Sequence, residues 1–289
     1  MSDQCIRLLV QCPDRSGIVA AVSGFLQQHK ANITALDQFS TDSVGGKLFM
    51  RIVCQIDSNL VQDELAFKSF QQNFQQNVAD HFKMTWSMTF SELKKNIYIL
   101  VSKHDHALME LLWEWNRGEL HANICGVISN HEDLKKEVLQ FGVPFYHIPV
   151  SANTRSESEK EVLKICKNNC DLIVLARYMQ ILSPDFVNHF PNKIINIHHS
   201  FLPAFVGADP YRQAFERGVK VIGATAHYVT DELDMGPIIS QDVEHVTHRE
   251  TVLSLRSTGR EIERRVLAQA VKWHIEDRVF VHENKTLIF

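Results

Sequence analysis

The chain has 289 residues, of which 45% are hydrophobic and 22% charged, and its formal net charge is −4 at pH 7. This composition is typical of a soluble globular protein of one or two domains, and it provides no basic field to attract nucleic acid. The sequence contains no apolar run of about 18 residues to span a bilayer. Its first residues lack the basic start and apolar stretch of a signal peptide. We therefore expect a cytoplasmic protein with reduced cysteines and with no nucleic-acid or membrane partner.

The first ninety residues alternate strand patterns with amphipathic helix patterns. The expected elements are a strand over 6–10, a helix from residue 18, strands over 32–42 and 47–56 around a hairpin-like turn at 43–46, a helix over 62–82 and a strand over 84–90. Ser16 is positioned to cap the first helix. The order βαββαβ predicts a small α+β sandwich over residues 1–90.

A polar, lysine-rich segment over residues 91–96 is interpreted as a linker to a second domain over residues 97–289. The second domain is expected to contain strands over 97–101, 124–128, 145–150, 172–176 and 194–197, and helices over 105–115, 132–141 and 157–167. Such alternation favours a parallel sheet covered by helices, so the overall class is α/β. After residue 197 the regular pattern ends in a stretch of small, polar and histidine residues. Ligand sites in open α/β sheets lie at strand carboxyl ends, so we expect the chemistry there.

Three residues of this stretch suit acyl transfer. Asn196 and His198 are two positions apart at a strand end, so their side chains project to the same side. An amide donor beside an imidazole suits a carbonyl that becomes an oxyanion. Asp234 lies in a loop bounded by Gly236 and Pro237, where a carboxylate is held and still meets solvent. Together they form a candidate site for acid–base and acyl-transfer chemistry.

Spacing alone leaves other interpretations open. Asn196 could satisfy backbone groups, His198 could be a surface imidazole, and Asp234 could be an ordinary turn aspartate. His198 and His199 could bind a metal, but adjacent strand residues point to opposite faces, which disfavours a metal site. The charged segment over residues 261–265 is interpreted as the solvated face of a helix.

The sequence from residue 196 to 241 resembles the catalytic core of the formyltransferase family that uses 10-formyltetrahydrofolate. The resemblance rests on Asn-x-His at 196–198 and Leu-Asp-x-Gly-Pro at 233–237, and it extends from about residue 94 to the end. It implies a Rossmann-like domain with a mostly parallel sheet, in which Asn196, His198 and Asp234 are catalytic. The substrate-binding residues that it implies are Arg177, Tyr178, Met179, Gln180, Ile181, Leu182, His199, Asp231, Glu232, Leu233, Met235 and Gly236.

The N-terminal stretch CPDRSGIVAAVSGFLQQHKANI resembles an ACT domain, a module that often binds amino-acid effectors. This resemblance implies an effector site at Asp14, Arg15, Ser16, Gly17 and Ile18, and pairing of subunits into a homo-oligomer. An ACT domain fused to this catalytic domain is similar to the formyltetrahydrofolate deformylases. That similarity implies hydrolysis of 10-formyltetrahydrofolate to formate and tetrahydrofolate without a cofactor or metal. It further implies that formate is supplied for purine synthesis and that one-carbon pools are balanced.

One departure from the transferases supports hydrolysis. Glycinamide ribonucleotide transformylase carries a glycine-rich turn after its first strand, whose backbone N–H groups hold the substrate phosphate. Residues 102–106 here read Ser-Lys-His-Asp-His, with no glycine and with a carboxylate, so we expect poor phosphate binding. His199 also replaces the proline that is common in the family motif. The alternatives are a formyltransferase with an unidentified amine acceptor, a non-enzymatic folate or amino-acid sensor, and a zinc hydrolase.

Overall fold

The computed structural model describes residues 4–42, 45–56, 64–151, 153–167, 169–204 and 209–289. The chain divides into two compact units, one of residues 1–93, 276–280 and 289, the other of residues 94–275 and 281–288. The segment 91–96, expected as a linker, spans this division, and its last two residues belong to the first strand of the second unit, Lys95–Val101.

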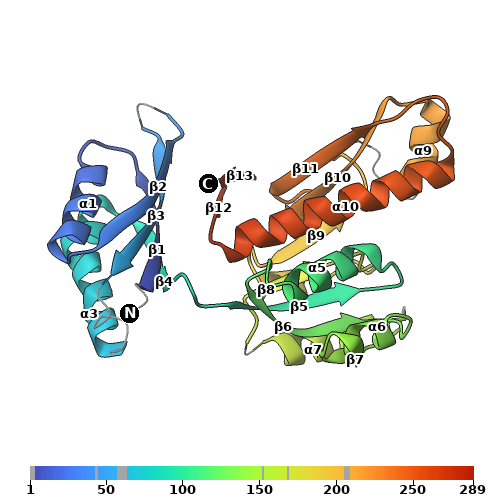
Figure 1. Cartoon of the computed structure of the whole chain (residues 1–289), viewed down its shortest axis with the longest axis horizontal. Coiled ribbons are helices and arrows are strands. Elements are labelled where there is room, and N and C mark those ends of the chain that lie inside the picture. The colour runs from blue at the N-terminus through green and yellow to red at the C-terminus, as the bar shows by residue number, and fades with distance from the viewer. Residues whose placement is uncertain (1–3, 43–44, 57–63, 152, 168, 205–208) are drawn as a thin grey trace. The chain divides into compact units, whose positions relative to one another are not determined.

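The first unit is a four-stranded antiparallel sheet in the order β2-β3-β1-β4. Its elements are β1 (Gln4–Pro13), α1 (Ile18–Gln28), β2 (Asn32–Ser40), β3 (Lys47–Ile56), α3 (Glu64–Phe74), the π-helical turn η1 (Gln75–Ala79), α4 (Asp80–Phe82) and β4 (Thr85–Phe90) (Figure 1). The expected βαββαβ order is therefore confirmed. Residues 43–44 of the expected turn and 62–63 of the expected helix lie outside the described residues.

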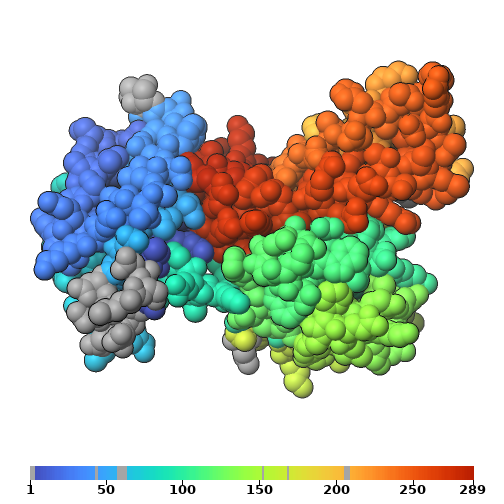
Figure 2. Space-filling model, viewed as in Figure 1, coloured from blue at the N-terminus to red at the C-terminus, as the bar shows by residue number. Residues whose placement is uncertain are grey.

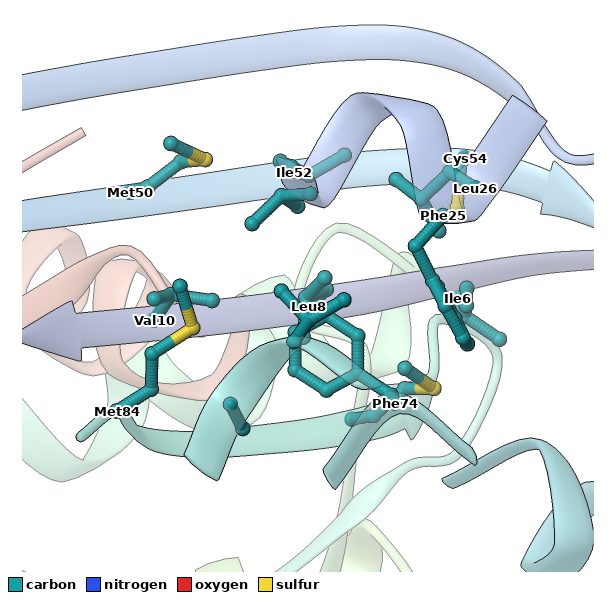
Figure 3. Packing of buried hydrophobic residues seen from close by; sticks show 14 of the residues in the cluster. Ile6, Leu8, Val10, Phe25, Leu26, Met50, Ile52, Cys54, Phe74 and Met84 are labelled. Carbon is teal, nitrogen blue, oxygen red and sulfur yellow. The ribbon is translucent and has the colours of Figure 1, made fainter. Parts of the chain in front are cut away.

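The core of this unit forms where α1 and α3 cover one face of the sheet. Ile6, Leu8 and Val10 alternate along β1, and each is 0% exposed because it faces the helices. Phe25 of α1 and Phe74 of α3 meet over them, with ring centroids 5.2 Å apart (Figure 3). The period of two in the strand therefore predicts the buried face correctly.

The expectation that Ser16 caps α1 is wrong. Gly17 is the N-cap residue, with φ of 91°, and no side chain among the described residues caps this helix end. A positive φ is a conformation that glycine adopts at little cost, so glycine rather than a hydroxyl residue is needed at this turn.

The second unit is built on a seven-stranded sheet in the order β11-β10-β9-β8-β5-β6-β7. Its elements are β5 (Lys95–Val101), α5 (His106–Asn116), β6 (Ala122–Ser129), α6 (Lys135–Gln140), β7 (Phe145–His147), α7 (Arg155–Cys166), β8 (Leu172–Leu175), α8 (Pro184–Asn188), β9 (Ile194–His198), α9 (Pro210–Arg217), β10 (Val221–Tyr228), β11 (Ile238–His245) and α10 (Val252–Ile275). The strands β9, β8, β5, β6 and β7 are parallel, whereas β10 is antiparallel to both of its neighbours. The expected mostly parallel α/β fold is confirmed. A hairpin of β12 (Val279–His282) and β13 (Lys285–Ile288) ends the chain.

The expectation that regular structure ends after residue 197 is wrong, because β10, β11 and α10 follow. β10 is buried along nearly its whole length, so its sequence shows no alternation of polar and apolar residues. Helix α10 packs on α5, α9, β9, β10 and β11 (Figure 1), and the space-filling view shows α5 and α10 at the surface of this unit (Figure 2). The expected strand over 145–150 is also shorter, ending at His147. No helix within the described ranges is both long and apolar enough to cross a membrane.

Candidate active site

The site lies where β9 ends and the loop between β10 and β11 folds back over it. Asn196 and His198 both belong to β9 and line one cavity, as their spacing predicts. Asp234 lies in the loop with a positive φ of 57°. A Cβ at residue 236 would lie only 1.8 Å from the carbonyl oxygen of Tyr228, so the loop approaches β10 this closely only because residue 236 is a glycine. Glycine at 236 is therefore required to bring Asp234 to the strand ends.

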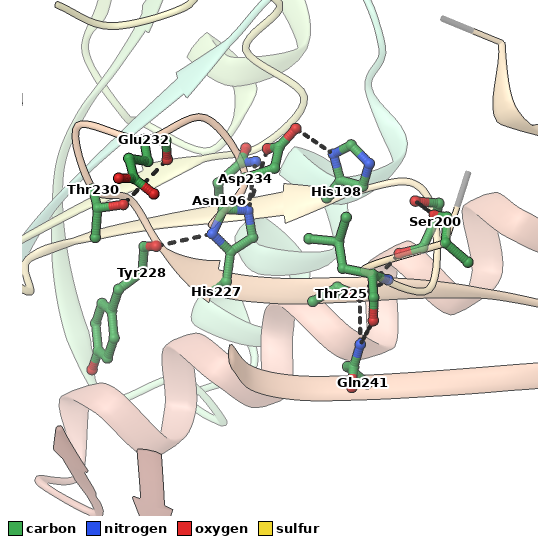
Figure 4. Close-up of polar contacts among 12 residues, drawn as sticks. Asn196, His198, Ser200, Thr225, His227, Tyr228, Thr230, Glu232, Asp234 and Gln241 are labelled. Atoms are coloured by element: carbon green, nitrogen blue, oxygen red, sulfur yellow. Dashed lines mark hydrogen bonds and ion pairs between the residues drawn. The ribbon is translucent and has the colours of Figure 1, made fainter. Parts of the chain in front are cut away.

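The Asp234 carboxylate lies between two imidazoles (Figure 4). Its Oδ2 is 3.3 Å from Nδ1 of His198, and its Oδ1 is 3.5 Å from Nε2 of His227. Asn196 Nδ2 lies 3.3 Å from the same Nε2 of His227. His227 Nδ1 lies 2.9 Å from the carbonyl oxygen of Tyr228, to which it donates a hydrogen bond that fixes the ring. Amide, carboxylate and two imidazoles thus form one connected network.

Electrostatics keep Asp234 ionised. Hydrogen bonds from His198 and His227 hold the pKa of the Asp234 carboxyl far below its usual range, and they outweigh the opposing effect of burial. His198 is only 8% exposed, and its Nε2 has no hydrogen-bond partner within the described part of the chain. Because Nδ1 faces Asp234, Nε2 is the ring nitrogen of this cavity-lining residue that stays without a partner among the residues described.

The cavity measures about 220 Å³ and collects most of the residues expected to bind substrate. Its lining contains Arg177, Tyr178, Met179, Gln180, Ile181, Leu182, His199, Asp231, Glu232 and Leu233 in addition to Asn196, His198 and Asp234. Large apolar side chains at its rim are partly exposed: 55% for Met179, 58% for Ile181 and 61% for Leu233. Such a rim suits a flat heteroaromatic ring.

Met235 and Gly236 line a different, adjoining cavity of about 530 Å³. Leu233 and Asp234 line both cavities, so this loop forms the wall between them. His227 was not predicted as a site residue, although it pairs directly with Asn196 in the β9–β10 ladder. A histidine within an otherwise small and apolar strand was the only signal of its role.

The residues expected to bind an effector form the turn between β1 and α1. Ile18 is 1% exposed and belongs to the core of the first unit. The guanidinium of Arg15 donates to the carbonyl oxygen of His81 and lies 4.4 Å from the centroid of the Phe82 ring. The backbone N–H of Asp14 donates to the carbonyl oxygen of Gly46 at 2.8 Å. Ser16 and Gly17 are exposed at the turn between these anchored residues.

The comparisons with known proteins match both units. The family model for formyl transferases matches residues 95–271, and the one for ACT domains matches residues 6–66. The chain is 54% identical to a formyltetrahydrofolate deformylase of Bacillus subtilis (strain 168), over 98% of this chain and 93% of that one. It is 42% identical to the deformylase of Escherichia coli (strain K12), over 96% of this chain and 95% of that one.

Solved structures of known proteins also match this chain. The crystal structure of a formyltetrahydrofolate deformylase from Pseudomonas syringae pv. tomato superposes with a TM-score of 0.93 at 44% identity, covering 100% of this chain and 95% of that one. Glycinamide ribonucleotide transformylase 1 from Symbiobacterium toebii superposes with a TM-score of 0.65 at 31% identity, covering 69% of this chain and 96% of that one. Fold, site and matches define a formyl transferase domain joined to an ACT domain. Within that class, the chain belongs to the formyltetrahydrofolate deformylases.

Proposed function

We propose that the protein hydrolyses 10-formyltetrahydrofolate to formate and tetrahydrofolate, and that it does so in the cytoplasm. The observation that carries this proposal is the ionised Asp234 held between His198 and His227, beside the Asn196 amide, in the wall of an apolar-rimmed cavity. The family name of the relatives agrees with it. Formate released in this way supplies purine synthesis and balances one-carbon pools.

In the proposed mechanism, Asp234 accepts a hydrogen bond from a water molecule and orients it toward the formyl carbon. As the C–O bond forms, the Asn196 amide and protonated His198 Nε2 donate to the developing oxyanion. Because the pKa of Asp234 is held low, the carboxylate does not retain the water proton but relays it toward N10 of the folate. Collapse then breaks the C–N10 bond and releases formate and protonated N10.

The folate is proposed to lie along the strand ends, with its pteridine between residues 177–182 and 231–236. Support comes from the cavity lining, which draws on both segments. Met235 and Gly236 act indirectly in this arrangement, since they shape the loop from the side of the adjoining cavity.

The proposal favours water over an amine as acceptor. The turn between β5 and α5 contains no glycine, and His106 at its end makes a 2.8 Å hydrogen bond to the buried Glu263. Without a glycine, the backbone of this turn is less able to approach a phosphate closely than the glycine-rich turn of the transferases. This difference favours water over an acceptor held by its phosphate.

The test follows formate and tetrahydrofolate release from 10-formyltetrahydrofolate by the purified protein without an amine. We propose a reaction without a metal or other cofactor, so release is expected at full rate in the presence of a chelator. Within the described ranges, no group of three His, Cys, Asp or Glu side chains is arranged to hold a metal ion. A requirement for an added amine would instead identify a formyltransferase. Loss of activity on chelation would revive a zinc hydrolase.

The first unit is proposed to act as a regulatory ACT domain over residues 1–90, with the catalytic domain over residues 97–289 in a homo-oligomer. The match to the ACT family over residues 6–66 supports an amino-acid effector at the turn of residues 14–18. Titrating the twenty amino acids while following hydrolysis would identify it. A null response to all of them would leave this unit a purely structural role.

A further inference from the structure

A buried polar cluster outside the catalytic trio lies next to the cavity. Its centre is Glu263 of α10, which is only 1% exposed. Its carboxylate accepts a 2.8 Å hydrogen bond from His106 Nε2 and a 2.7 Å hydrogen bond from the Tyr211 hydroxyl. Arg177 Nε lies 3.6 Å from its Oε2, an ion-pair distance but too long for a hydrogen bond.

Glu263 is a true anion in spite of its burial. Burial raises the pKa of this carboxyl, but the His106 hydrogen bond and the Arg177 charge outweigh it and lower the pKa to about 2. Gly259, four residues earlier on α10, makes the arrangement possible, because a Cβ there would lie 2.0 Å from the Tyr211 hydroxyl oxygen. The cluster is therefore built to hold a negative charge beneath Arg177.

Both the backbone conformation and the hydrogen bonding of Arg177 are energetically unfavourable. It follows β8 with a positive φ of 64°, a conformation that costs a non-glycine residue about 1–2 kcal/mol. It is only 9% exposed, yet its Nε and Nη1 have no hydrogen-bond partner among the described residues. Both oxygens of Glu263 accept hydrogen bonds from His106 and Tyr211, so this carboxylate attracts the guanidinium without accepting hydrogen bonds from its Nε and Nη1.

The unused donors belong to two residues that line the catalytic cavity. Arg177 is one of them and His198 is the other, and the Nε2 of His198 is likewise buried without a partner in the described part of the chain. Unsatisfied buried donors each cost about 1–3 kcal/mol, so an anionic acceptor that satisfies them is stabilised. Charge-assisted hydrogen bonds to a carboxylate are among the strong ones in proteins.

We propose that Arg177 and His198 form a subsite for formate, the carboxylate that hydrolysis produces. The inference rests on the proposed function. Water supplies the oxygen of the new C–O bond, the C–N10 bond breaks and N10 takes one of the two protons of that water. The other proton leaves formic acid for solvent water, and one negative charge stays on formate. Arg177 is the cation that accepts this charge, and Glu263 holds Arg177 in place as a positioning residue.

The test is inhibition by sodium formate during hydrolysis, at ionic strength kept constant with sodium chloride. The variant is Arg177→Gln, which removes the charge and leaves a shorter but still polar, unbranched side chain. The control is Arg265→Gln, whose side chain is 57% exposed on the same helix as Glu263 and pairs with Asp242. Formate is expected to inhibit wild type and R265Q equally, and R177Q only at concentrations at least about tenfold higher, since 1.4 kcal/mol is a tenfold change in affinity. Equal inhibition constants in wild type and R177Q would overturn the subsite.

A second measurement does not depend on the variant folding or on turnover. The thermal midpoint of the wild-type full chain is recorded with formate, acetate or chloride at equal ionic strength. A ligand that binds only the folded state raises this midpoint, so formate is expected to raise it more than chloride, and acetate less than formate because of its extra methyl group. A formate effect no larger than that of chloride contradicts the subsite. Absence of formate release by wild type, in contrast, would refute the hydrolysis itself.

Discussion

The Oδ2 oxygen of Asp234 lies 3.3 Å from Nδ1 of His198, whose second ring nitrogen is buried without a hydrogen-bond partner among the described residues. The pair joins a loop with positive φ to the end of a buried strand. One carboxylate thereby orients the imidazole and remains within reach of a water molecule. Both effects depend on the negative charge of Asp234.

Replacing that charge is the direct test of the mechanism. Asp234→Asn is nearly isosteric, but its amide neither accepts hydrogen bonds from both imidazoles nor orients water as a carboxylate does. We expect kcat to fall by at least about 10³-fold, the upper range for loss of one preorganised polar group, while folate binding survives. Formate release and folate binding are measured separately. Asp242→Asn, which removes an exposed partner of Arg265, serves as control and should retain wild-type turnover. A variant at 234 with most of its activity would refute the assigned role.

Asn196 is predicted to contribute through its amide N–H alone. Asn196→Ala should lower kcat by about 10²–10³-fold with a smaller change in KM, because the oxyanion exists only in the transition state. Asn123→Ala removes an exposed amide on β6 that pairs with Asn96, and it should leave both constants unchanged. If KM rises while kcat is kept, Asn196 binds the ground state and is not an oxyanion donor.

The sequence predicts the first unit well because its strands have one buried face. The alternation of Ile6, Leu8 and Val10 with less buried neighbours specifies both the strand and its orientation. The second unit is predictable up to β9, where apolar strands and amphipathic helices alternate. The prediction from sequence fails from β10 onward. This strand is buried on both faces and rich in small residues, so its sequence lacks the period of two.

The trio of the candidate site was predictable from spacing and motif, but its partners were not. His227 reaches Asp234 because β10 pairs antiparallel with β9, and this pairing leaves no trace in residue spacing. Glu263 was interpreted as part of a solvated helix face, and that interpretation is wrong: the structure buries it against His106 and Tyr211. Charge alone does not reveal burial when the neutralising groups come from elements far away in the chain.

Gly259 tests the packing that supports the buried cluster. In Gly259→Ala the new Cβ would lie 2.0 Å from the Tyr211 hydroxyl oxygen and 2.2 Å from the nearest carbon of its ring, so Tyr211 must move and its hydrogen bond to Glu263 is lost. We expect the free energy of unfolding to fall by about 2 kcal/mol, measured by urea denaturation. Gly24→Ala in α1, where a Cβ meets nothing within 4 Å, should be neutral or stabilising by up to about 1 kcal/mol. Equal stabilities of G259A and wild type would contradict the close approach of Tyr211 to α10.

The charge of Glu263 should make stability depend on pH in a defined window. The pKa of this carboxyl is lowered to about 2 in the folded state, against an ordinary 4.5, so its ionised form stabilises the fold above pH 4.5. This contribution, about 3 kcal/mol for a shift of that size, is lost as the pH falls from 4.5 toward 2. Glu263→Gln lacks it at every pH and leaves Arg177 without its counter-ion, so the variant should be strongly destabilised at pH 7 and should differ clearly less from wild type at about pH 3, inside the window in which the contribution is lost. Unfolding by urea at about pH 7, 4 and 3 measures the difference. Glu261→Gln, at an exposed position of α10, should follow wild type throughout. A gap between wild type and E263Q that stays constant from about pH 7 to about pH 3 would mean that Glu263 carries no charge in the folded protein.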